Sequence, residues 1–495
     1  MTGVNRPGRS GPAATARRDA ARDAARDATR DADRRWPILV VVLVALVFAA
    51  VVDRLSDDGR SSGAVEVAGP TIPSADSLSN AWYCAIGSSA PDGPTPETII
   101  VTNLGPRRLQ ASVTVMPGGG GESVTRDIDV AARSQTRVPV ADVLATPEPG
   151  VVVETFGGPA VVEHQVVGND DVAVGPCATG PSAAWYFAAG TTDRDTQLWL
   201  ALFNPFGDDA IVDLTFLTDG GVLAPGDLQG IVVPRRTRVM VPLHDSVRRQ
   251  ATVATQVRTR TGRVVAEQAS VREADPRGLS VSLGTPELST RWSLPVGGVG
   301  GGGVVSIANP GASPAQVTVR IRLDGDATLA PRVVVVPSRA AVAVDVGARV
   351  PAGLGAWIEI DAAGTPVVVE QTLGRSPTGL ATALGVPTTA RRWAFAAGRI
   401  AGDTADSIVV ANRGRRPARV TLRVIGGGSS DTPQPVVRVA PGRRFAFDLG
   451  ALGVADDAGI LVDATHPLAV VRQSVGSTGI TVSPGIPGPA PDETP

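Results

Sequence analysis

The sequence has 495 residues with 46 basic and 48 acidic side chains, and this balance excludes a globally basic nucleic-acid-binding protein. A chain of this length exceeds a single hydrophobic core, so several domains are expected. Aromatic residues make up only 4% of the chain, whereas 57 glycines and 41 prolines favour a β-rich fold with many tight turns.

Residues 1–35 are rich in Arg, Asp and Ala, and an Arg recurs every four residues from Arg18 to Arg34. On a helix these arginines lie along one stripe, and Asp residues three positions before the next Arg offset their repulsion. The interleaved Asp residues weaken binding to nucleic acid or lipid. We therefore predict a solvated, partly helical cytoplasmic tail, with a contact to the membrane surface as the alternative.

An unbroken apolar run from Ile38 to Val52 follows Trp36 and Pro37. The run is short for a span of about 20 residues, but a thin bilayer can accommodate it. Arg residues precede the run and Asp residues follow it, which places the N-terminus in the cytoplasm. Residues 36–52 are thus predicted as a transmembrane signal anchor with an extracytoplasmic remainder, and a cleaved signal peptide is the alternative. Residues 53–80 read as a flexible linker.

Beyond the linker, one unit of about a hundred residues occurs four times, at 81–180, 181–288, 289–389 and 390–486, before a disordered tail at 487–495. Each copy opens with a Trp, at Trp82, Trp185, Trp292 and Trp393. An Asn then ends an apolar run, at Asn103, Asn204, Asn309 and Asn412. A Val-Val element later leads to a Gln, at Gln165, Gln268, Gln371 and Gln473.

Short alternating strands separated by turn residues fill each unit, and no 3.6-residue period follows the apolar run. In the second copy we predict strands at 185–189, 197–203, 210–217, 230–233, 237–242, 254–260, 264–271 and 280–283. This density is typical of a β-sandwich, so we predict an all-β fold of four tandem immunoglobulin-like sandwiches. A four-fold, propeller-like ring of β-sheet units is the alternative.

The landmarks are interpreted structurally. Each Trp is expected to anchor a core, each Asn to form a turn through its side chain, and each Gln to satisfy a buried backbone group. A recurring ligand site at these positions is the alternative.

The two cysteines, Cys84 and Cys177, lie near the start and the end of the first unit. A disulfide between them would close a loop of roughly ninety residues and contribute about 4 kcal/mol in the chain-entropy model. It would also indicate an oxidising compartment, whereas a pair of buried thiols is the alternative.

Chemistry-bearing clusters are scarce in the sequence. His164, His244 and His466 are far apart, no metal-ligand spacing occurs, and no catalytic or cofactor-binding residue is predicted. Single carboxylates, at Glu163, Glu267 and Glu370, lie near the Gln of their units, which does not provide the pair of a glycosidase.

Three acidic or Gly-rich segments imitate ligand-binding motifs. Residues 298–303 fit G-x-G-x-x-G but precede a strand, so they are predicted as a loop. Asp170-Asp171 and the stretch 324–326 have too few ligands for a calcium loop.

The segments Trp185–Gly190 (Trp-Tyr-Phe-Ala-Ala-Gly) and Val264–Gln268 (Val-Val-Ala-Glu-Gln) resemble repeats of bacterial cell-surface proteins. Those repeats carry Trp-Tyr-Phe-Ala-Glu-Gly and Val-Ala-Glu-Arg, so this chain departs from them at Ala189 and Gln268. The whole chain is similar to a family of uncharacterised, membrane-anchored secreted proteins of actinobacteria. This resemblance implies location and architecture, and no activity.

These observations predict a non-catalytic scaffold or binding protein of the cell envelope, held by a single membrane span. Cell-wall polysaccharide and envelope proteins are the candidate partners, and nucleic acid is not. An accessory factor for envelope polysaccharide assembly is the first alternative, and an envelope hydrolase is the second.

Overall fold

The computed structural model describes residues 69–169, 171–295, 303–325, 327, 329–351, 354–400, 404–427, 435–477 and 479–490. The predicted tail, the predicted anchor and the linker up to residue 68 lie outside the described residues. In the described part of the chain, no helix is long and apolar enough to cross a membrane. The chain divides into two compact units, Met1–Glu66 and Val67–Pro495, and the fold given below is that of the second.

Four successive groups of strands correspond to the four sequence repeats. Repeat 1 has β1 (Ser79–Cys84), β2 (Glu97–Asn103), β3 (Leu109–Pro117), β4 (Val124–Val130), β5 (Gln135–Pro139), η1 (Val140–Asp142), β6 (Pro149–Phe156), β7 (Ala160–Val167) and β8 (Val172–Pro176). Repeat 2 has β9 (Ala184–Phe187), β10 (Thr196–Asn204), β11 (Ala210–Thr218), β12 (Gly221–Leu223), η2 (Gly226–Leu228), β13 (Ile231–Val233), β14 (Thr237–Pro242), α2 (Leu243–Ser246), β15 (Val253–Thr261), β16 (Val265–Arg272) and β17 (Gly278–Leu283).

The remaining strands form the second half of this unit. Repeat 3 has β18 (Arg291–Leu294), β19 (Val304–Asn309), β20 (Ala315–Leu323), β21 (Arg332–Val336), β22 (Ala340–Asp345), η3 (Gly347–Arg349), β23 (Ala356–Ala362), β24 (Val368–Gly374) and β25 (Leu380–Leu384). Repeat 4 has β26 (Ala390–Phe395), β27 (Ala405–Ala411), β28 (Ala418–Gly426), β29 (Val436–Val439), β30 (Arg444–Asp448), β31 (Ala458–Gly476), β32 (Gly479–Pro484) and β33 (Ile486–Gly488).

Each repeat consists of two antiparallel sheets. In repeat 1 the strand orders are β1-β6-β3-β4 and β5-β2-β7-β8, and repeats 2 and 3 follow the same plan. In repeat 4 the long strand β31 belongs to both sheets, because its first half pairs with β28 and its second half with β27. Alternation sets the inward faces: in β20, Val317, Val319 and Ile321 are buried while Arg322 is exposed. The fold is therefore all-β, with paired sheets in every repeat, as the strand pattern predicted.

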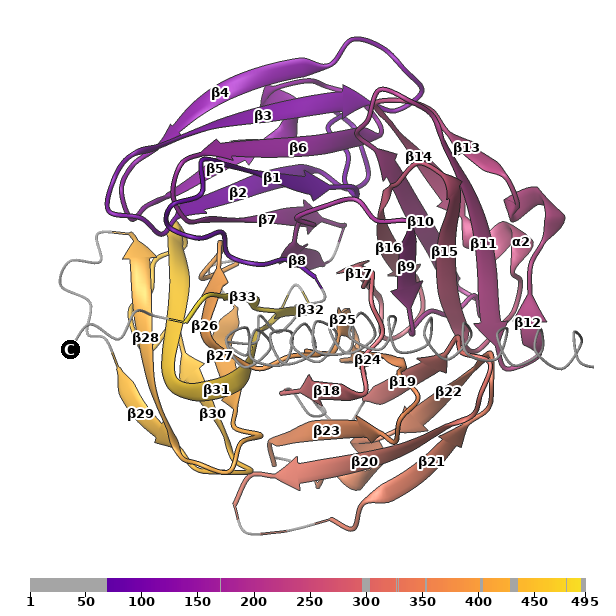
Figure 1. Ribbon diagram of the computed structural model, residues 1–495, viewed down its shortest axis with the longest axis vertical. Coiled ribbons are helices and arrows are strands. Elements are labelled where there is room, and N and C mark those ends of the chain that lie inside the picture. Colours follow the sequence, from indigo (N-terminus) through magenta and orange to yellow (C-terminus); the bar gives the residue numbers. More distant parts are fainter. Residues whose placement is uncertain are drawn as a thin grey trace, which may run out of the picture. The chain divides into compact units, whose positions relative to one another are not determined.

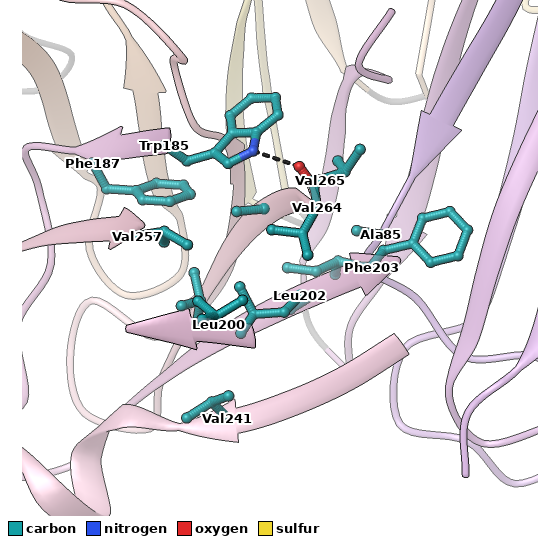
Figure 2. Close-up of a cluster of buried hydrophobic side chains, with 14 of the residues drawn as sticks. Ala85, Trp185, Phe187, Leu200, Leu202, Phe203, Val241, Val257, Val264 and Val265 are labelled. Atoms are coloured by element: carbon teal, nitrogen blue, oxygen red, sulfur yellow. Dashed lines mark hydrogen bonds between the residues drawn. The ribbon is translucent and has the colours of Figure 1, made fainter. Parts of the chain in front are cut away.

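The four landmark tryptophans lie in the cores, each at most 2% exposed. Figure 2 shows Trp185 above side chains from both sheets of repeat 2, including Leu200 and Val257. Its indole Nε1 donates to the Val264 carbonyl at 2.7 Å, and Trp292 and Trp393 make the equivalent bond to Val367 and Leu468. In these three repeats, burial of a large ring with its one donor satisfied fixes how the two sheets face each other. Trp82 is equally buried, but its Nε1 has no hydrogen-bond partner among the described residues.

The four landmark asparagines join the end of one sheet to the other, and each is at most 1% exposed. The Asn103 amide donates to the carbonyls of Arg107 and Val130, and its side-chain oxygen accepts the Gly105 N–H at 2.9 Å. Asn204, Asn309 and Asn412 repeat this arrangement. The side chain thus forms the expected turn and also satisfies carbonyls at the edge of the opposite sheet.

The repeats follow one another around a centre, within the unit Val67–Pro495 (Figure 1). The innermost strand of each repeat, β8, β17, β25 or β32, contacts the innermost strands on both sides, and β32 contacts β8. Paired-sheet repeats and a ring, which the sequence offered as alternatives, therefore occur together.

Hydrophobic cores continue across the boundaries between repeats, which we call seams 1/2, 2/3, 3/4 and 4/1. Seam 4/1 joins the last repeat to the first: Ala396 and Ile486 belong to the same buried cluster as Trp82. The chain ends reinforce this closure, because the Ile72 N–H donates to the Pro487 carbonyl at 2.7 Å and β33 pairs with β26. Ile72 and Pro487, which were predicted within the linker and the tail, thus take part in this closure.

Candidate functional site

The register of the inner sheets corrects the alignment of the Gln landmark. In each repeat, the residue four positions before the landmark Asn pairs with one residue of the neighbouring strand. These partners are His164, Gln268, Gln371 and Arg472. Gln165 and Gln473 lie one residue further along, and adjacent strand residues point to opposite faces. Their predicted equivalence with the other two glutamines is therefore wrong, whereas Gln268 and Gln371 do occupy equivalent, buried positions.

One residue before this position lies a buried carboxylate, Glu163, Glu267 or Glu370, in three of the repeats. We call these three the seam carboxylates, and each is 0% exposed. Each reaches the loop that follows the first strand of the preceding repeat. Glu370 accepts the N–H groups of Ala188 and Ala189, both at 2.6 Å, across seam 2/3. Glu267 accepts those of Ala85 and Ile86 at 3.1 and 2.7 Å across seam 1/2.

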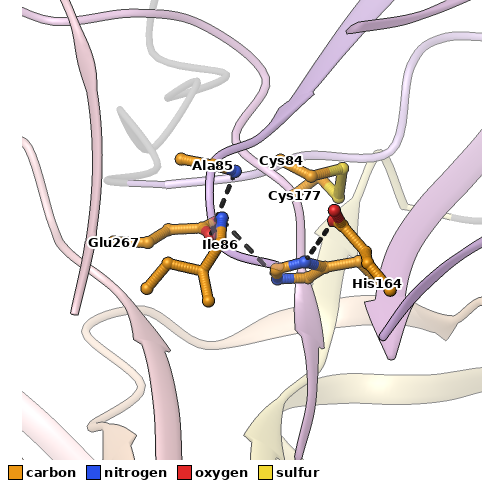
Figure 3. Close-up of a disulfide and its surroundings, with 7 residues drawn as sticks. Cys84, Ala85, Ile86, His164, Cys177 and Glu267 are labelled. Carbon is orange, nitrogen blue, oxygen red and sulfur yellow. Dashed lines mark hydrogen bonds and ion pairs between the residues drawn. A yellow bond between two sulfur atoms is a disulfide. The ribbon is translucent and has the colours of Figure 1, made fainter. Parts of the chain in front are cut away.

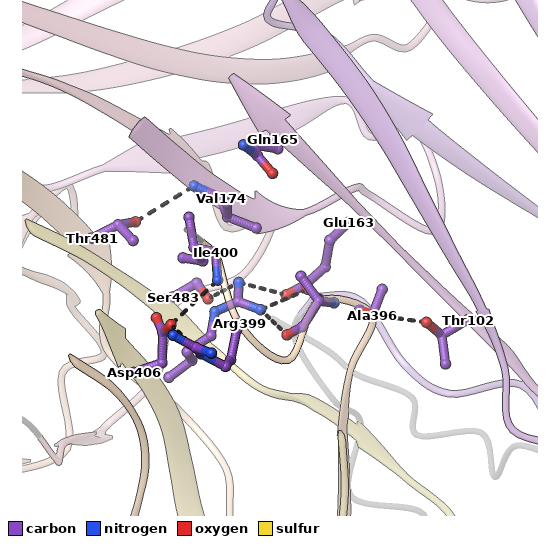
Figure 4. Close-up of polar contacts among 12 residues, drawn as sticks. Thr102, Glu163, Gln165, Val174, Ala396, Arg399, Ile400, Asp406, Thr481 and Ser483 are labelled. Carbon is purple, nitrogen blue, oxygen red and sulfur yellow. Dashed lines mark hydrogen bonds and ion pairs between the residues drawn. The ribbon is translucent and has the colours of Figure 1, made fainter. Parts of the chain in front are cut away.

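Glu163 makes the same contact across seam 4/1, where it accepts the Ala397 N–H at 2.8 Å (Figure 4). Here a cation joins it: Arg472 donates to both carboxylate oxygens of Glu163, at 2.9 and 3.1 Å, and to Ser483 at 2.9 Å. Arg472 is 1% exposed and also donates to the Ala397 carbonyl. Two partners 309 positions apart in the sequence thus close the ring with a buried, bidentate ion pair.

Seam 1/2 holds a larger buried network of charges (Figure 3). His164 Nδ1 lies 3.0 Å from Glu97 Oε1, and its Nε2 lies 3.7 Å from Glu267 Oε1. Arg238 donates to the Ala85 carbonyl at 2.9 Å from the same seam. With His164 protonated, two cations balance two carboxylates, so the seam buries no net charge.

The pKa values of these groups follow from the contacts. Burial opposes the charge on His164, but attraction from Glu267 and Glu97 outweighs it and raises the His164 pKa to about 9. Burial raises the pKa of Glu267 to about 6, although His164 and two backbone N–H groups act against it. No cation of the described residues lies beside Glu370, and burial raises its pKa to about 7.

This isolation of Glu370 predicts a pH dependence of stability. A raised folded-state pKa means that Glu370 stabilises the fold fully below about pH 4.5, and that this contribution is lost as the pH rises through about 7. The shift corresponds to about 3 kcal/mol. We expect Glu370→Gln, which keeps an acceptor for both N–H groups, to remove this loss when urea unfolding is measured between pH 5 and 8.

The control for this experiment is Glu154→Gln, a change at an exposed carboxylate of β6. It should leave the pH profile of the wild-type protein unchanged. An E370Q profile that still loses stability between pH 5 and 8 as the wild type does would assign the titration to another group.

Seam 3/4 is built differently, because Val471 occupies the position of the seam carboxylate and Pro295, which lacks an N–H, begins the facing loop. Two arginines of repeat 4 join the repeats instead. Arg413 donates to the Trp292 carbonyl at 2.8 Å and pairs with Asp361. Arg444 makes a bidentate pair with Asp324, both bonds being 2.8 Å.

Asp171 of repeat 1 joins the repeats near the centre of the ring. Its Oδ2 accepts the N–H groups of Leu279 and Leu380, each at 3.3 Å, from repeats 2 and 3. A Cβ at Gly278 or Gly479 would lie 2.5 or 1.9 Å from this carboxylate, so only glycine fits beside it. Because Asp171 accepts backbone N–H groups, its contacts are those of a structural cross-link and not of a calcium ligand. Asp170 lies outside the described residues.

The two cysteines form a disulfide, Cys84–Cys177, with Cα atoms 4.8 Å apart (Figure 3). The bond joins the first strand of repeat 1 to the segment that follows its last strand, as the sequence predicted. Tyr83 and Ala178 exchange backbone hydrogen bonds beside it, at 2.8 and 2.9 Å.

The remaining chemistry-bearing residues do not converge. His244 bonds the Leu198 carbonyl at 3.0 Å, while His466 contacts Thr465 at the surface. Asp324 belongs to the pair with Arg444, and most of the Gly-rich segment 298–303 lies outside the described residues. Among the described residues no group of three His, Cys, Asp or Glu side chains could hold a metal ion. The seam carboxylates were visible in the sequence only as single glutamates, because their partners come from the neighbouring repeat.

Comparisons with known proteins place this architecture in context. A family model described as a family of unknown function (DUF5719) matches residues 168–285 and 265–479, together more than half of the chain. No curated protein matches. One solved structure, the α-L-rhamnosidase of Streptomyces avermitilis complexed with L-rhamnose, is similar at 9% identity with a TM-score of 0.13. That match covers 67% of this chain and 47% of the other.

Proposed function

Because the chain belongs to DUF5719, a family of unknown function, we propose its role from its own geometry: a non-catalytic ring scaffold that presents binding surfaces on the outer side of the cell membrane. The apolar run at 38–52 would hold it there, with the N-terminus in the cytoplasm. The disulfide supports an oxidising compartment, since such bonds are rare in the cytosol.

The main support for a non-catalytic role is that the seam carboxylates are buried and bonded to the backbone. A general acid or base must reach a substrate, whereas Glu163, Glu267 and Glu370 are 0% exposed and bonded to backbone N–H groups of the preceding repeat. The pKa values of Glu267 and Glu370 are raised in the manner of catalytic carboxylates, but the same burial that raises them seals them inside the seams.

Cell fractionation combined with envelope cross-linking tests this proposal. The full chain should be recovered in the membrane fraction, with its ring accessible to protease from outside and cross-linked to envelope polymer or protein. Recovery in the cytoplasm with reduced cysteines would contradict it. So would turnover of an envelope polymer that Glu267→Gln or Glu370→Gln abolishes while the protein stays folded.

The identity of the captured material separates two versions of the role. Recovery of glycosyltransferases together with polymer would favour an accessory factor in polysaccharide assembly. Recovery of polymer alone would favour a scaffold that binds the finished envelope.

A further inference from the structure

We infer that a cleft on seam 4/1 binds an oxyanion, a phosphate or a carboxylate, carried on a unit the size of a sugar. The cleft has a volume of about 850 Å³. Repeat 4 contributes Arg392 and Arg423 to its walls, and repeat 1 contributes Arg133 and Leu104. The segment 72–76 forms a further side. This inference deepens the proposed binding role, and it depends on that role only for where the ligand comes from.

The equivalent part of seam 3/4 explains why space is left here. In seam 3/4 the residue after the landmark Asn is Arg413, and its guanidinium fills the gap by bonding Trp292 and Asp361 of the neighbouring repeat. In seam 4/1 the residue at that position is Leu104, which cannot make these bonds. The pocket therefore stays open, with apolar walls that suit a sugar ring and arginines at its edge.

The charge of the cleft favours an anion. Asp463 corresponds to Asp361 in strand register, and it already receives both Arg392, at 2.8 Å, and Arg423, at 3.4 Å. Asp76 is the carboxylate that lines the cleft itself, and it accepts a bond from Ser74. Three guanidinium groups thus face two carboxylates, so the cleft keeps a net positive charge, and guanidinium forks match oxyanions in geometry.

Arg133 is the arginine that repeat 1 contributes to the cleft. Its backbone has φ 48°, in the left-handed region, and Arg236 and Arg339 have φ 53° and 52° at the equivalent turn. Repeat 4 has Gly442 there, so glycine fits this turn without strain. The guanidinium of Arg133 forms no ion pair or side-chain hydrogen bond with the described part of the chain. Arg133 lines the cleft, whereas Arg339, with the same backbone conformation, does not, so the Arg133 side chain is placed to bind an anionic partner from outside the chain.

The test compares Arg133→Gly with Arg339→Gly in the full-length protein. Both changes put glycine at the same left-handed turn, so each should leave the melting temperature equal to or above that of the wild type. Isothermal titration would use trigalacturonic acid, glucose 1-phosphate and, as the neutral probe, maltotriose. We expect one or both anions to bind the wild type and R339G, with at least tenfold weaker binding to R133G.

Each outcome decides the inference. Binding of trigalacturonic acid alone would identify a carboxylate ligand, and binding of glucose 1-phosphate alone a phosphate. Absence of binding to the folded wild type, equal affinity for maltotriose, or unchanged affinity in R133G would overturn it. Failure of envelope capture with successful titration would instead count against the proposed location and leave the cleft assignment standing.

Discussion

Replacing Arg472 with Met is expected to lower the free energy of unfolding by about 3–5 kcal/mol, because it leaves the Glu163 carboxylate buried without its cation. Both side chains are at most 1% exposed, so water cannot take the place of the guanidinium. Chemical unfolding at pH 8 measures this loss.

The chain supplies a matched control in Gln371, which occupies the equivalent position in repeat 3, because the residue that corresponds to Glu163 in the following repeat is Val471 and not a carboxylate. Gln371→Met should lower the free energy of unfolding by less than about 1 kcal/mol, because it leaves no buried charge without a partner. The double variant E163Q/R472M should recover most of the loss, since the glutamine still accepts the Ala397 N–H. Equal losses in R472M and Q371M would mean that the ion pair does not hold seam 4/1.

Much of the fold within one repeat could be predicted from the sequence. The strand predicted at 237–242 coincides with β14, and the other predicted strands of repeat 2 differ from the observed ones by at most two residues at either end. The signals were local, namely period-2 alternation, turn residues, and a Trp or Asn repeated at similar spacing. Such signals can be recognised in the sequence because burial on one face and turn geometry are set by neighbouring residues. β12 begins at a glycine and its first two residues are exposed, so it lacks the buried residue that marks the equally short β13.

The seams could not be predicted, because their contacts join residues of different repeats. Glu163 and Arg472 carry complementary charges, but nothing in the linear sequence brings residues 309 positions apart together unless the ring is known. The Gln landmark failed for a related reason. A one-residue offset is invisible in a short motif, yet it turns a side chain to the other face of a strand, as at Gln165. The arginine at a left-handed turn, Arg133, has no sequence signature.

In the other three repeats, a large apolar side chain and a glycine occupy the two positions that the cysteines occupy in repeat 1. The residue at the position of Cys84 is Phe187, Leu294 or Phe395, and the residue at the position of Cys177 is a glycine, Gly284, Gly385 or Gly485. A Cβ on Gly284 would lie 2.7 Å from the Phe187 ring, and one on Gly485 would lie 2.9 Å from the Phe395 ring. A large side chain opposite a glycine thus fills the volume that the two sulfurs fill in repeat 1.

We therefore expect Cys84→Phe with Cys177→Gly to be clearly more stable than Cys84→Ala with Cys177→Ala. The alanine pair loses the cross-link, worth about 4–5 kcal/mol in the chain-entropy model for a separation of 93 residues, and also leaves a cavity. The Phe–Gly pair loses the same cross-link but buries a ring, which returns about 1.5–3 kcal/mol. Thermal unfolding with and without reductant separates the two effects, since reductant should destabilise the wild type alone. If the Phe–Gly variant is no more stable than the alanine pair, the core of repeat 1 is shaped for the disulfide. It then cannot take the Phe–Gly packing found in other repeats.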